Sequence, residues 1–359
     1  MTMGGDYALL LTELLIDVPK ELHEVYSFFP DQTTFESGFE LYLKQGRYTE
    51  KRQANLIKKW HDFDSVAYKK QLAVNRIHFI TIEDNQYPQR LKEIPFPPLV
   101  LFYKGTIELL REPCLGVVGT RHPSSYGKRC TETFCRGLAN SFCIVSGLAL
   151  GIDSIAHRAI LEVSGMTIAV MPCSLDRCYP VRHQGLFDSI EKKGLLISEY
   201  PLKITALPYR IPQRNRLISG LSLGVLIVES KIKSGTLITA RLAAEQNREV
   251  FTVPHPIGSD LGEGPHYLLK EGATLVTTVS DITDAFDHLC LTQAPVLPPP
   301  NLSPEEHRVW ALLSQTPKPI EVLASELNCT ISDLLQTISL LELKDLIEIG
   351  SEQSLKRCS

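Results

Sequence analysis

The chain has 359 residues and a formal net charge of −4, with 43% hydrophobic and 22% charged residues. These values are ordinary for a soluble globular protein of about two or three domains. No run approaches the roughly 18 apolar residues that a membrane span requires. The N-terminus has neither a basic region nor a small-residue cleavage site, which argues against a signal peptide. We therefore expect a cytoplasmic protein with no membrane partner.

Nine cysteines are scattered along the chain, and none of them forms a C-x-x-C motif. An odd number of thiols in apolar patterns predicts free cysteines in a reducing compartment rather than disulfides. Cys173 and Cys178 lie near the end of a predicted strand but have no histidine at ligand spacing. The sequence therefore predicts no metal site there.

The first 75 residues are predicted to form a small helical domain, of the SAM or helix-hairpin-helix type, because apolar residues recur at spacings of three and four. Its basic residues between Lys51 and Lys70 are interpreted as a solvated helix face, with a weak nucleic-acid surface as the alternative. A strand is predicted at the start of residues 76–104. The proline-rich segment that follows is expected to be extended, without a helix or a central strand.

Between residues 112 and 290 the pattern is a strand, a turn and a helix, several times over. Each strand is a short and almost continuous apolar run, which is typical of strands buried on both faces of a parallel sheet. The predicted strands span 115–119, 142–146, 167–171, 195–198, 224–228, 249–253 and 274–276. The predicted helices begin near Tyr126, Ile152, His183, Arg214, Thr236, Pro265 and Ser280. Residues 76–290 are therefore predicted to be an α/β domain with a doubly wound, Rossmann-like parallel sheet.

Residues 291–302 are rich in proline and uncharged, which predicts an extended linker. The Ser303-Pro304-Glu305-Glu306 sequence is a helix capping box, and three helices fit the segment 303–359, as in a winged-helix module. Residues 301–359 contain nine acidic and five basic residues, a net charge of −4. The presumed recognition helix has no cation before Lys344. A role in protein contact or dimer support is therefore favoured over DNA binding.

The strongest functional signal is a local excess of positive charge beside glycine-rich turns. Residues 203–248 contain eight Lys and Arg but only two acidic residues, a net charge of +6 in a chain whose total is −4. Three turns between a strand and a helix are rich in Gly, Ser and Thr, and such turns direct backbone N–H groups at an anion. The candidate ligands are Gly119, Thr120, Arg121, Ser146, Gly147, Arg214, Arg216, Lys231, Lys233, Ser234, Gly235 and Thr236. So many cations predict a row of phosphates rather than a single one.

Catalytic and nucleotide-cofactor motifs are missing at the expected places. The first turn lacks the G-x-G-x-x-G of a dinucleotide site, and no G-x-x-x-x-G-K-[ST] is present. Asp153 and His157 share one face of a predicted helix and are interpreted as a structural pair. Glu199 follows a strand and is expected to pair with an arginine. A binding protein without a cofactor is favoured over an enzyme.

Several motifs resemble the DNA processing protein A (DprA, also called Smf) family. They are GTR (119–121) followed by YG, SGLALGID (146–153), LD-xx-YP (175–180), ISEYP (197–201), PQRNR (212–216) and SGTLITA (234–240). The resemblance implies a Rossmann-like core that binds single-stranded DNA without sequence preference. It also implies protection of incoming DNA during natural transformation (competence), loading of the RecA recombinase, and a homodimer.

Carried over by motif, the DNA-contacting residues of that family correspond to Arg121, to Arg214-Asn215-Arg216, and to Lys231 and Lys233. The chain departs from the family pattern at residues 172–174, 183, 254–255 and 264–266, in loops beside the expected pocket. The alternative function is that of a nucleotide phosphoribohydrolase of the lysine decarboxylase-like group. That group has a PGG-x-GT-xx-E turn, whereas the SGTLIT turn here has no acid before Glu245. A third alternative is a structural adaptor that binds no DNA.

Overall fold

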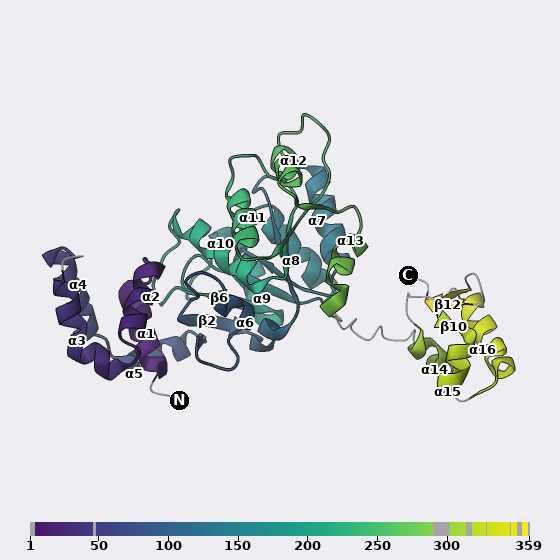
Figure 1. Ribbon diagram of the computed structural model, residues 1–359, viewed down its shortest axis with the longest axis horizontal. Coiled ribbons are helices and arrows are strands. Elements are labelled where there is room, and N and C mark those ends of the chain that lie inside the picture. The colour runs from purple at the N-terminus through teal and green to yellow at the C-terminus, as the bar shows by residue number, and fades with distance from the viewer. Residues whose placement is uncertain are drawn as a thin grey trace. The chain divides into compact units, whose positions relative to one another are not determined.

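The computed structural model describes residues 4–45, 48–289, 302–313, 318–327, 329–344, 346–349 and 354–357. The described residues form two units, one up to residue 289 and one from residue 302 onward (Figure 1). None of the helices in these ranges is both long enough and apolar enough to cross a membrane.

The first unit contains a nine-stranded sheet in the order β1-β2-β6-β5-β4-β3-β7-β8-β9. The strands are β1 His78–Thr81, β2 Val100–Gly105, β3 Cys114–Val118, β4 Cys143–Ser146, β5 Thr167–Val170, β6 Leu195–Ser198, β7 Gly224–Ile227, β8 Glu249–Thr252 and β9 Thr274–Leu275. Strands β3 to β9 pair in parallel, and β2 pairs antiparallel with both β1 and β6. The predicted doubly wound sheet is confirmed, with an antiparallel extension at one edge.

The expectation that the proline-rich segment lacks helix and central strand is wrong. A short helix, α6 Gln89–Lys92, begins after Pro88, and β2 is paired on both sides within the sheet. The physical reason is the position of the prolines, since the last of them, Pro98, precedes β2. Every residue of β2 therefore keeps its N–H donor for the strand ladder.

Helices cover both faces of the sheet, as the buried side chains require. They are α7 Ser125–Gly137, α8 Ile152–Glu162, α9 Gln184–Lys193, α10 Arg210–Leu221, α11 Gly235–Glu245, α12 Glu263–Lys270 and α13 Ser280–Thr283, with 3-10 turns at Ile107–Arg111, Val181–His183 and Asp284–Leu289. Phe134 of α7 and Ile160 of α8 pack in one core cluster with Val117. Leu217 of α10 and Ala240 of α11 pack with Val225 in another cluster. Figure 1 shows α10 and α11 side by side.

Helix α10 begins at Arg210, one turn before the predicted start near Arg214. Pro212 lies in the first turn, where the N–H that proline lacks would have no partner within the helix. The proline therefore permits the earlier start.

Strand order reverses at the middle of the sheet. The chain runs from β3 outward through β4 and β5 to β6, and then returns to place β7 on the other side of β3. Loops that follow two such diverging strands leave a crevice between them, and ligands of open α/β sheets bind at this position. The loops after β3 and β7 carry Arg121 and Lys233, respectively.

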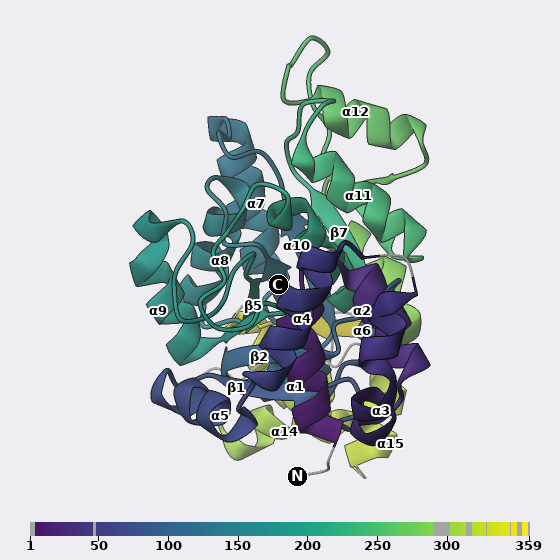
Figure 2. The same cartoon turned by 90° about the vertical axis from the view of Figure 1, so that its left-hand side faces the viewer.

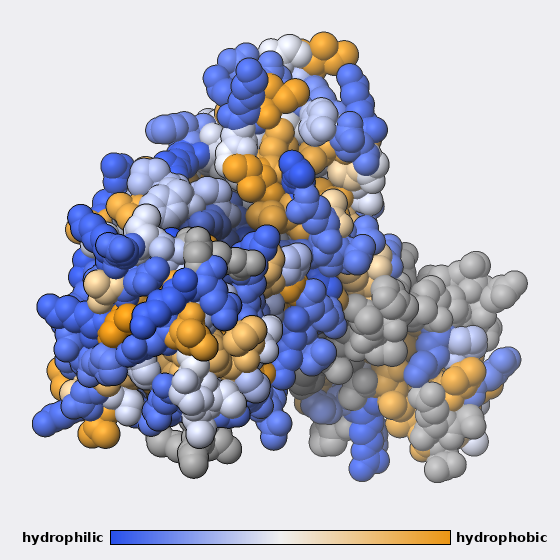
Figure 3. All heavy atoms as spheres, turned by 60° about the vertical axis from the view of Figure 1, so that its left-hand side comes forward, coloured by the Kyte–Doolittle hydropathy of each residue, from blue (hydrophilic) through white to orange (hydrophobic). Residues whose placement is uncertain are grey.

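Helices α1 Gly4–Leu15, α2 Pro19–Phe28, α3 Gln32–Lys44, α4 Glu50–His61 and α5 Ser65–Val74 form the N-terminal helical module. This module lies beside β1 and β2 (Figures 1 and 2). Leu11 and Phe39 belong to the same core cluster as Phe102 of β2 and Leu196 of β6. The module and the sheet therefore share one continuous core. Hydrophilic residues predominate on the face that Figure 3 turns toward the reader.

The second unit contains α14 Pro304–Leu312, α15 Ile320–Leu327 and α16 Ile331–Leu343, with an antiparallel sheet in the order β10-β12-β11. Its strands are β10 Lys318–Pro319, β11 Ile347–Ile349 and β12 Ser354–Arg357. Trp310, Leu323, Leu341 and Leu355 lie in its core. Three helices followed by a two-stranded wing confirm the predicted winged helix, whereas the linker predicted at 291–302 lies almost entirely outside the described residues.

The predicted capping box is present at the start of α14. The Ser303 hydroxyl accepts from the Glu306 N–H at 3.2 Å, and the Ser303 N–H donates to the Glu306 carboxylate at 2.7 Å. Ser303→Ala removes one acceptor, so we expect the second unit to lose about 1 kcal/mol of stability. Hydrogen exchange of α14 and α16 measures this loss. Ser303→Thr should restore protection, and equal exchange in all three proteins would contradict the prediction.

Candidate nucleic-acid interface

A pocket of about 690 Å³ lies at the reversal of strand order between β3 and β7. Its walls come from the loops after β3, β4 and β7 and from the first turns of α10 and α11. Of the predicted site residues, it is lined by Gly119, Thr120, Arg121, Arg214, Asn215, Lys231, Lys233, Ser234, Gly235 and Thr236. The structure thus brings together residues that are more than a hundred positions apart.

The loop after β3 has a fixed backbone that presents an exposed Arg121 side chain. The Thr120 N–H donates to the Glu229 carbonyl at 2.8 Å, and the Thr120 carbonyl accepts from the Ile152 N–H at 3.2 Å. Gly151 has φ +79°, and a Cβ there would approach the Thr120 carbonyl oxygen to 2.2 Å. Glycine at 151 is therefore required for the loops after β3 and β4 to pack together.

Glu229, buried after β7, links this loop to α7. Its carboxylate accepts from the Ser124 N–H at 2.9 Å and also from the Ser124 hydroxyl. Ser124 in turn caps α7 by accepting from the Gly127 N–H at 3.1 Å. The only acid between Lys203 and Arg241 is thus used internally and does not pair with the cations of the pocket rim.

The turn after β7 places a helix N-terminus at the pocket. Ser234 is the extended residue before α11, but its hydroxyl bonds the Ser230 hydroxyl at 2.6 Å and does not cap the helix. No side chain in the described part of the chain therefore caps the first N–H groups of α11, and the open space around Gly235 leaves them accessible. Such a helix end attracts anions through its N–H groups and its dipole.

Three exposed cations surround this helix end. Arg121 and Lys233 have no carboxylate within ion-pair distance among the residues that the structure describes. The Lys231 ammonium lies 3.6 Å from the Asp260 carboxylate, with the two side chains 62% and 79% exposed. An ion pair this exposed contributes little and is readily exchanged for a phosphate.

Arg214 also belongs to the pocket, but as part of its floor. Only 2% of it is exposed, and its Nη1 donates to the Gly147 carbonyl at 2.8 Å and to the Val170 carbonyl. A Cβ at Gly147 would lie 2.3 Å from this guanidinium. Burial lowers the pKa of Arg214, yet an arginine remains charged in a protein. Its charge therefore contributes a positive potential beneath the pocket rather than a free phosphate ligand.

Three predicted site residues lie away from the pocket surface. Arg216 points to the other side of α10, where it is paired with the buried Glu199. Ser146 donates its hydroxyl to the Val117 carbonyl at 2.6 Å, and the Gly147 N–H donates to the Asp153 carboxylate at 3.0 Å. Each of these three residues thus has a polar group bonded within the protein, as buried polar groups usually do. The prediction that Glu199 pairs with an arginine is confirmed.

Asp153 and His157 are structural, although they do not bond each other. Burial raises the pKa of Asp153 against the opposing effects of Arg214 and the Gly147 N–H. The His157 Nδ1 lies 2.8 Å from the Thr167 hydroxyl, which itself donates to the Ile144 carbonyl. His157 therefore carries its proton on Nδ1, and its buried Nε2 has no hydrogen-bond partner among the described residues.

Some pocket residues were not predicted. Ala149, Ile211 and Thr239 line it, and Asp260 adds an acid to its rim. Thr239 has a sequence signal, because it lies one turn after Thr236 on the same face of α11. Its hydroxyl accepts from the Asn215 amide at 2.9 Å, which joins α10 to α11. Asp260 comes from a distant loop and had no such signal.

A larger groove of about 1010 Å³ opens on the other side of the Ser234-Gly235 turn. It lies between α11, the start of β8 and α12, and its walls include Ile238, Val250 and Tyr267. The groove also contains Arg241 and Arg248, but these are paired with Glu245 and Glu93, so the smaller pocket beside Arg121 is the better phosphate site.

The chain thus combines a doubly wound α/β domain, a cationic pocket at the switch point of its sheet, and a winged helix. Residues 78–287 match the family model described as DNA recombination-mediator protein A, and residues 293–351 match the DprA winged helix domain. The chain belongs to the DNA recombination-mediator protein A (DprA) family, which confirms the resemblance seen in the motifs.

Relatives from several bacteria support this assignment. The chain is 47% identical over 209 residues to Protein Smf of Escherichia coli, covering 58% of this chain and 56% of that protein. It is 41% identical over 241 residues to DNA processing protein DprA of Streptococcus pneumoniae, covering 67% of this chain and 80% of that protein. The chain thus spans little more than half the length of the first relative.

Two solved structures share the fold. The crystal structure of DNA processing protein A from Streptococcus pneumoniae superposes with a TM-score of 0.68 at 35% identity, over 79% of this chain and 98% of that one. A structure of DNA processing protein A from Helicobacter pylori, described for its single-stranded DNA binding mode, has a TM-score of 0.54 at 32% identity. The match covers 60% of this chain and 98% of that one.

Arg216→Ala should distinguish the structural arginine from the exposed cations. The substitution leaves the Glu199 carboxylate buried and unpaired, which costs about 3–5 kcal/mol of unfolding free energy. Lys233→Ala should change stability by less than about 0.5 kcal/mol because this side chain is exposed. Urea unfolding measures both values, and equal stability of the two variants would contradict this division.

His157 should make the protein less stable in mild acid. Burial lowers the pKa of His157 to about 3, whereas an unfolded histidine titrates near 6.5. Below pH 6.5 only the unfolded chain gains this proton, so the unfolding free energy falls by up to about 1.4 kcal/mol per pH unit. Unfolding measured from pH 7 to 4 should show this slope. His157→Leu should flatten the slope, and an unchanged slope would exclude His157 as its source.

Proposed function

We propose that the protein binds single-stranded DNA through this pocket and that it is a binding protein rather than an enzyme. Arg121, Lys231 and Lys233 neutralise phosphates around the rim, and the first N–H groups of α11 bond one phosphate directly. The observation that carries the proposal is this convergence of three exposed cations on an uncapped helix end.

A single strand suits the shape of the site better than a duplex. The pocket is concave and its cations surround a recess of about 690 Å³, which a flexible backbone can enter. The related structure from Helicobacter pylori, described for single-stranded DNA binding, supports the same choice. Phosphate contacts carry no sequence information, so we propose binding without sequence preference.

The wider role is proposed from family membership. The family is described as a DNA recombination mediator, and the pneumococcal relative is a DNA processing protein. We propose that the protein protects incoming single strands during natural transformation and helps to load RecA on them, acting as a homodimer. The acidic winged helix is proposed to contact protein rather than DNA.

The alternative of a nucleotide phosphoribohydrolase has less support. That activity needs a carboxylate free to act on the sugar. Asp153 reaches the pocket, but its carboxylate accepts the Gly147 N–H, and Asp260 lies beside Lys231 on the exposed rim. Incubation with nucleoside monophosphates separates the two functions, since release of free base would favour the hydrolase.

Charge reversal at Arg121 or Lys233 should weaken binding to every oligonucleotide alike. Loss of one charge-assisted contact worth about 1.5 kcal/mol raises the Kd roughly tenfold. Each change should also reduce the salt slope of log K by about 0.7, the value for one phosphate on a single strand. Fluorescence anisotropy at several salt concentrations measures both quantities.

Lys193→Glu is the matched control, because this exposed lysine ends α9 just before β6. It therefore lies at the amino ends of the parallel strands, whereas the pocket lies at their carboxyl ends. It should leave the salt slope nearly unchanged. If Arg121→Glu and Lys233→Glu bind as well as the wild type, the pocket is not the DNA site.

A further inference from the structure

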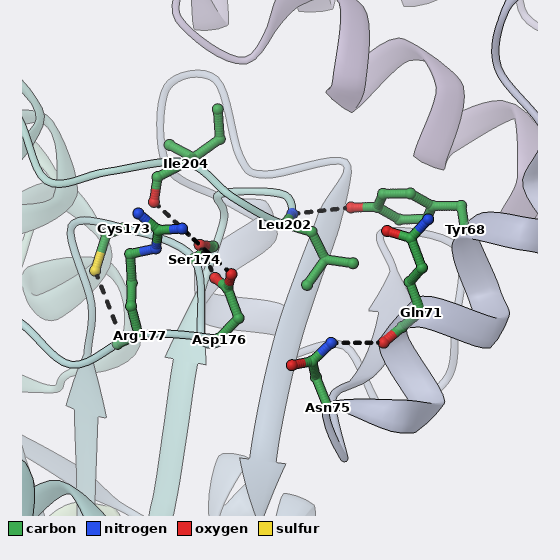
Figure 4. A network of polar contacts seen from close by, with 9 residues as sticks. All are labelled: Tyr68, Gln71, Asn75, Cys173, Ser174, Asp176, Arg177, Leu202 and Ile204. Carbon is green, nitrogen blue, oxygen red and sulfur yellow. Dashed lines mark hydrogen bonds and ion pairs between the residues drawn. The ribbon is translucent and has the colours of Figure 1, made fainter.

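The connection between β6 and α10 is held by the N-terminal helical module. The Leu202 N–H donates to the Tyr68 hydroxyl of α5 at 3.1 Å, and the Ile204 carbonyl accepts from the Ser174 N–H and hydroxyl, each at 3.0 Å (Figure 4). Leu202 also belongs to the core cluster that contains the helices of the module. The start of the connection is therefore fixed from two sides.

The end of the connection between β6 and α10 is fixed by Asp17, which lies between α1 and α2. One Asp17 carboxylate oxygen accepts from the Arg210 Nη2 at 2.5 Å, from the Arg210 Nε at 3.0 Å and from the Tyr209 hydroxyl at 3.1 Å. The Arg210 Nη1 donates to the Thr205 carbonyl at 2.6 Å. The arginine side chain is 5% exposed and the Asp17 side chain 49% exposed. Arg210 is thus a buried anchor whose anionic partner lies at the surface.

Arg210 is the first residue of α10, and that helix forms one wall of the pocket. Ile211, Arg214 and Asn215, within the next turn and a half, line the pocket. Arg214 is bonded to the Gly147 and Val170 carbonyls, and Asn215 is bonded to Thr239 of α11. A shift of the first turn of α10 would therefore move both the floor of the pocket and its link to α11.

We propose that Asp17 is a positioning residue for the phosphate pocket: through Arg210 the N-terminal helical module fixes the first turn of α10 and with it the pocket wall. The inference rests on the proposed single-strand binding. Asp17 does not line the pocket, so it acts through Arg210 and not by touching DNA.

The direction in which Asp17→Asn changes the affinity for DNA separates this inference from simple electrostatics. Asp17→Asn removes a negative charge from a protein that binds a polyanion, so long-range Coulomb attraction alone would increase affinity. Loss of the anchor instead loosens the pocket wall and decreases affinity. The amide of Asn accepts more weakly from the guanidinium than a carboxylate does, with nearly unchanged size.

The experiment compares the full chain with Asp17→Asn, Asp17→Glu and Glu21→Gln. Glu21 is the matched control, since its carboxylate pairs with Arg52 at 2.6 Å within the N-terminal helical module rather than with α10. Affinity for a fluorescent oligothymidylate is measured by anisotropy at several salt concentrations. Hydrogen exchange of residues 210–216 is measured without DNA.

For Asp17→Asn we expect roughly fivefold weaker binding, within the usual range of coupling between sites, and faster exchange across 210–216. The salt slope should stay at the wild-type value because no phosphate contact is lost. Asp17→Glu keeps the carboxylate and should restore most of the affinity, and Glu21→Gln should behave as wild type.

Unchanged exchange in Asp17→Asn would overturn the inference, whatever happens to DNA binding. Unchanged or tighter DNA binding by Asp17→Asn would also overturn it, while weakened binding by Lys233→Glu would leave the proposed function intact. If Glu21→Gln reproduces the effect of Asp17→Asn, general destabilisation of the module replaces positioning as the explanation. If the wild type binds no single strand, the proposed function fails, and exchange across 210–216 still decides whether Asp17 anchors α10.

Discussion

The reversal of strand order between β3 and β7 is the constraint on which the site depends. Two parallel strands whose following helices lie on opposite faces leave a crevice at their carboxyl ends. Arg121 comes from the loop after one strand and Lys233 from the loop after the other. Positive groups that would repel one another in isolation are held together because the core of the sheet fixes the strands that carry them.

Below the rim, buried polar groups keep this crevice in shape. Glu229 ties the loop after β3 to α7, and Arg214 fills the space beneath Gly147 with hydrogen bonds to two carbonyls. Groups buried this deeply must be bonded, since an unpaired one costs more than the bond contributes. The site therefore separates into exposed cations that are free for a ligand and buried ions that are committed to structure.

The N-terminal helical module is joined to the α/β domain both by packing and by an ion pair. Its helices share a core with β2 and β6, and its only carboxylate bonded to α10 is that of Asp17 among the residues described between 4 and 75. The winged helix is a second unit with its own core around Trp310 and Leu341. One accessory part is thus continuous with the α/β domain through packed side chains, whereas the other has a separate core.

Apolar runs in the sequence were enough to predict strands β3 to β9. Strands β3 to β7 are buried at every position, as inner strands of a parallel sheet are. Local motifs also indicated the turns that carry Arg121 and Lys233. The sequence could not distinguish these two from Arg214 and Arg216, because a charge count contains no information about burial. Tertiary structure decided that Arg214 lies in the pocket floor, that Arg216 pairs with Glu199, and that β2 is an inner strand. The physical reason is that pairing and burial depend on groups brought close by the fold, and sequence distance does not measure that proximity.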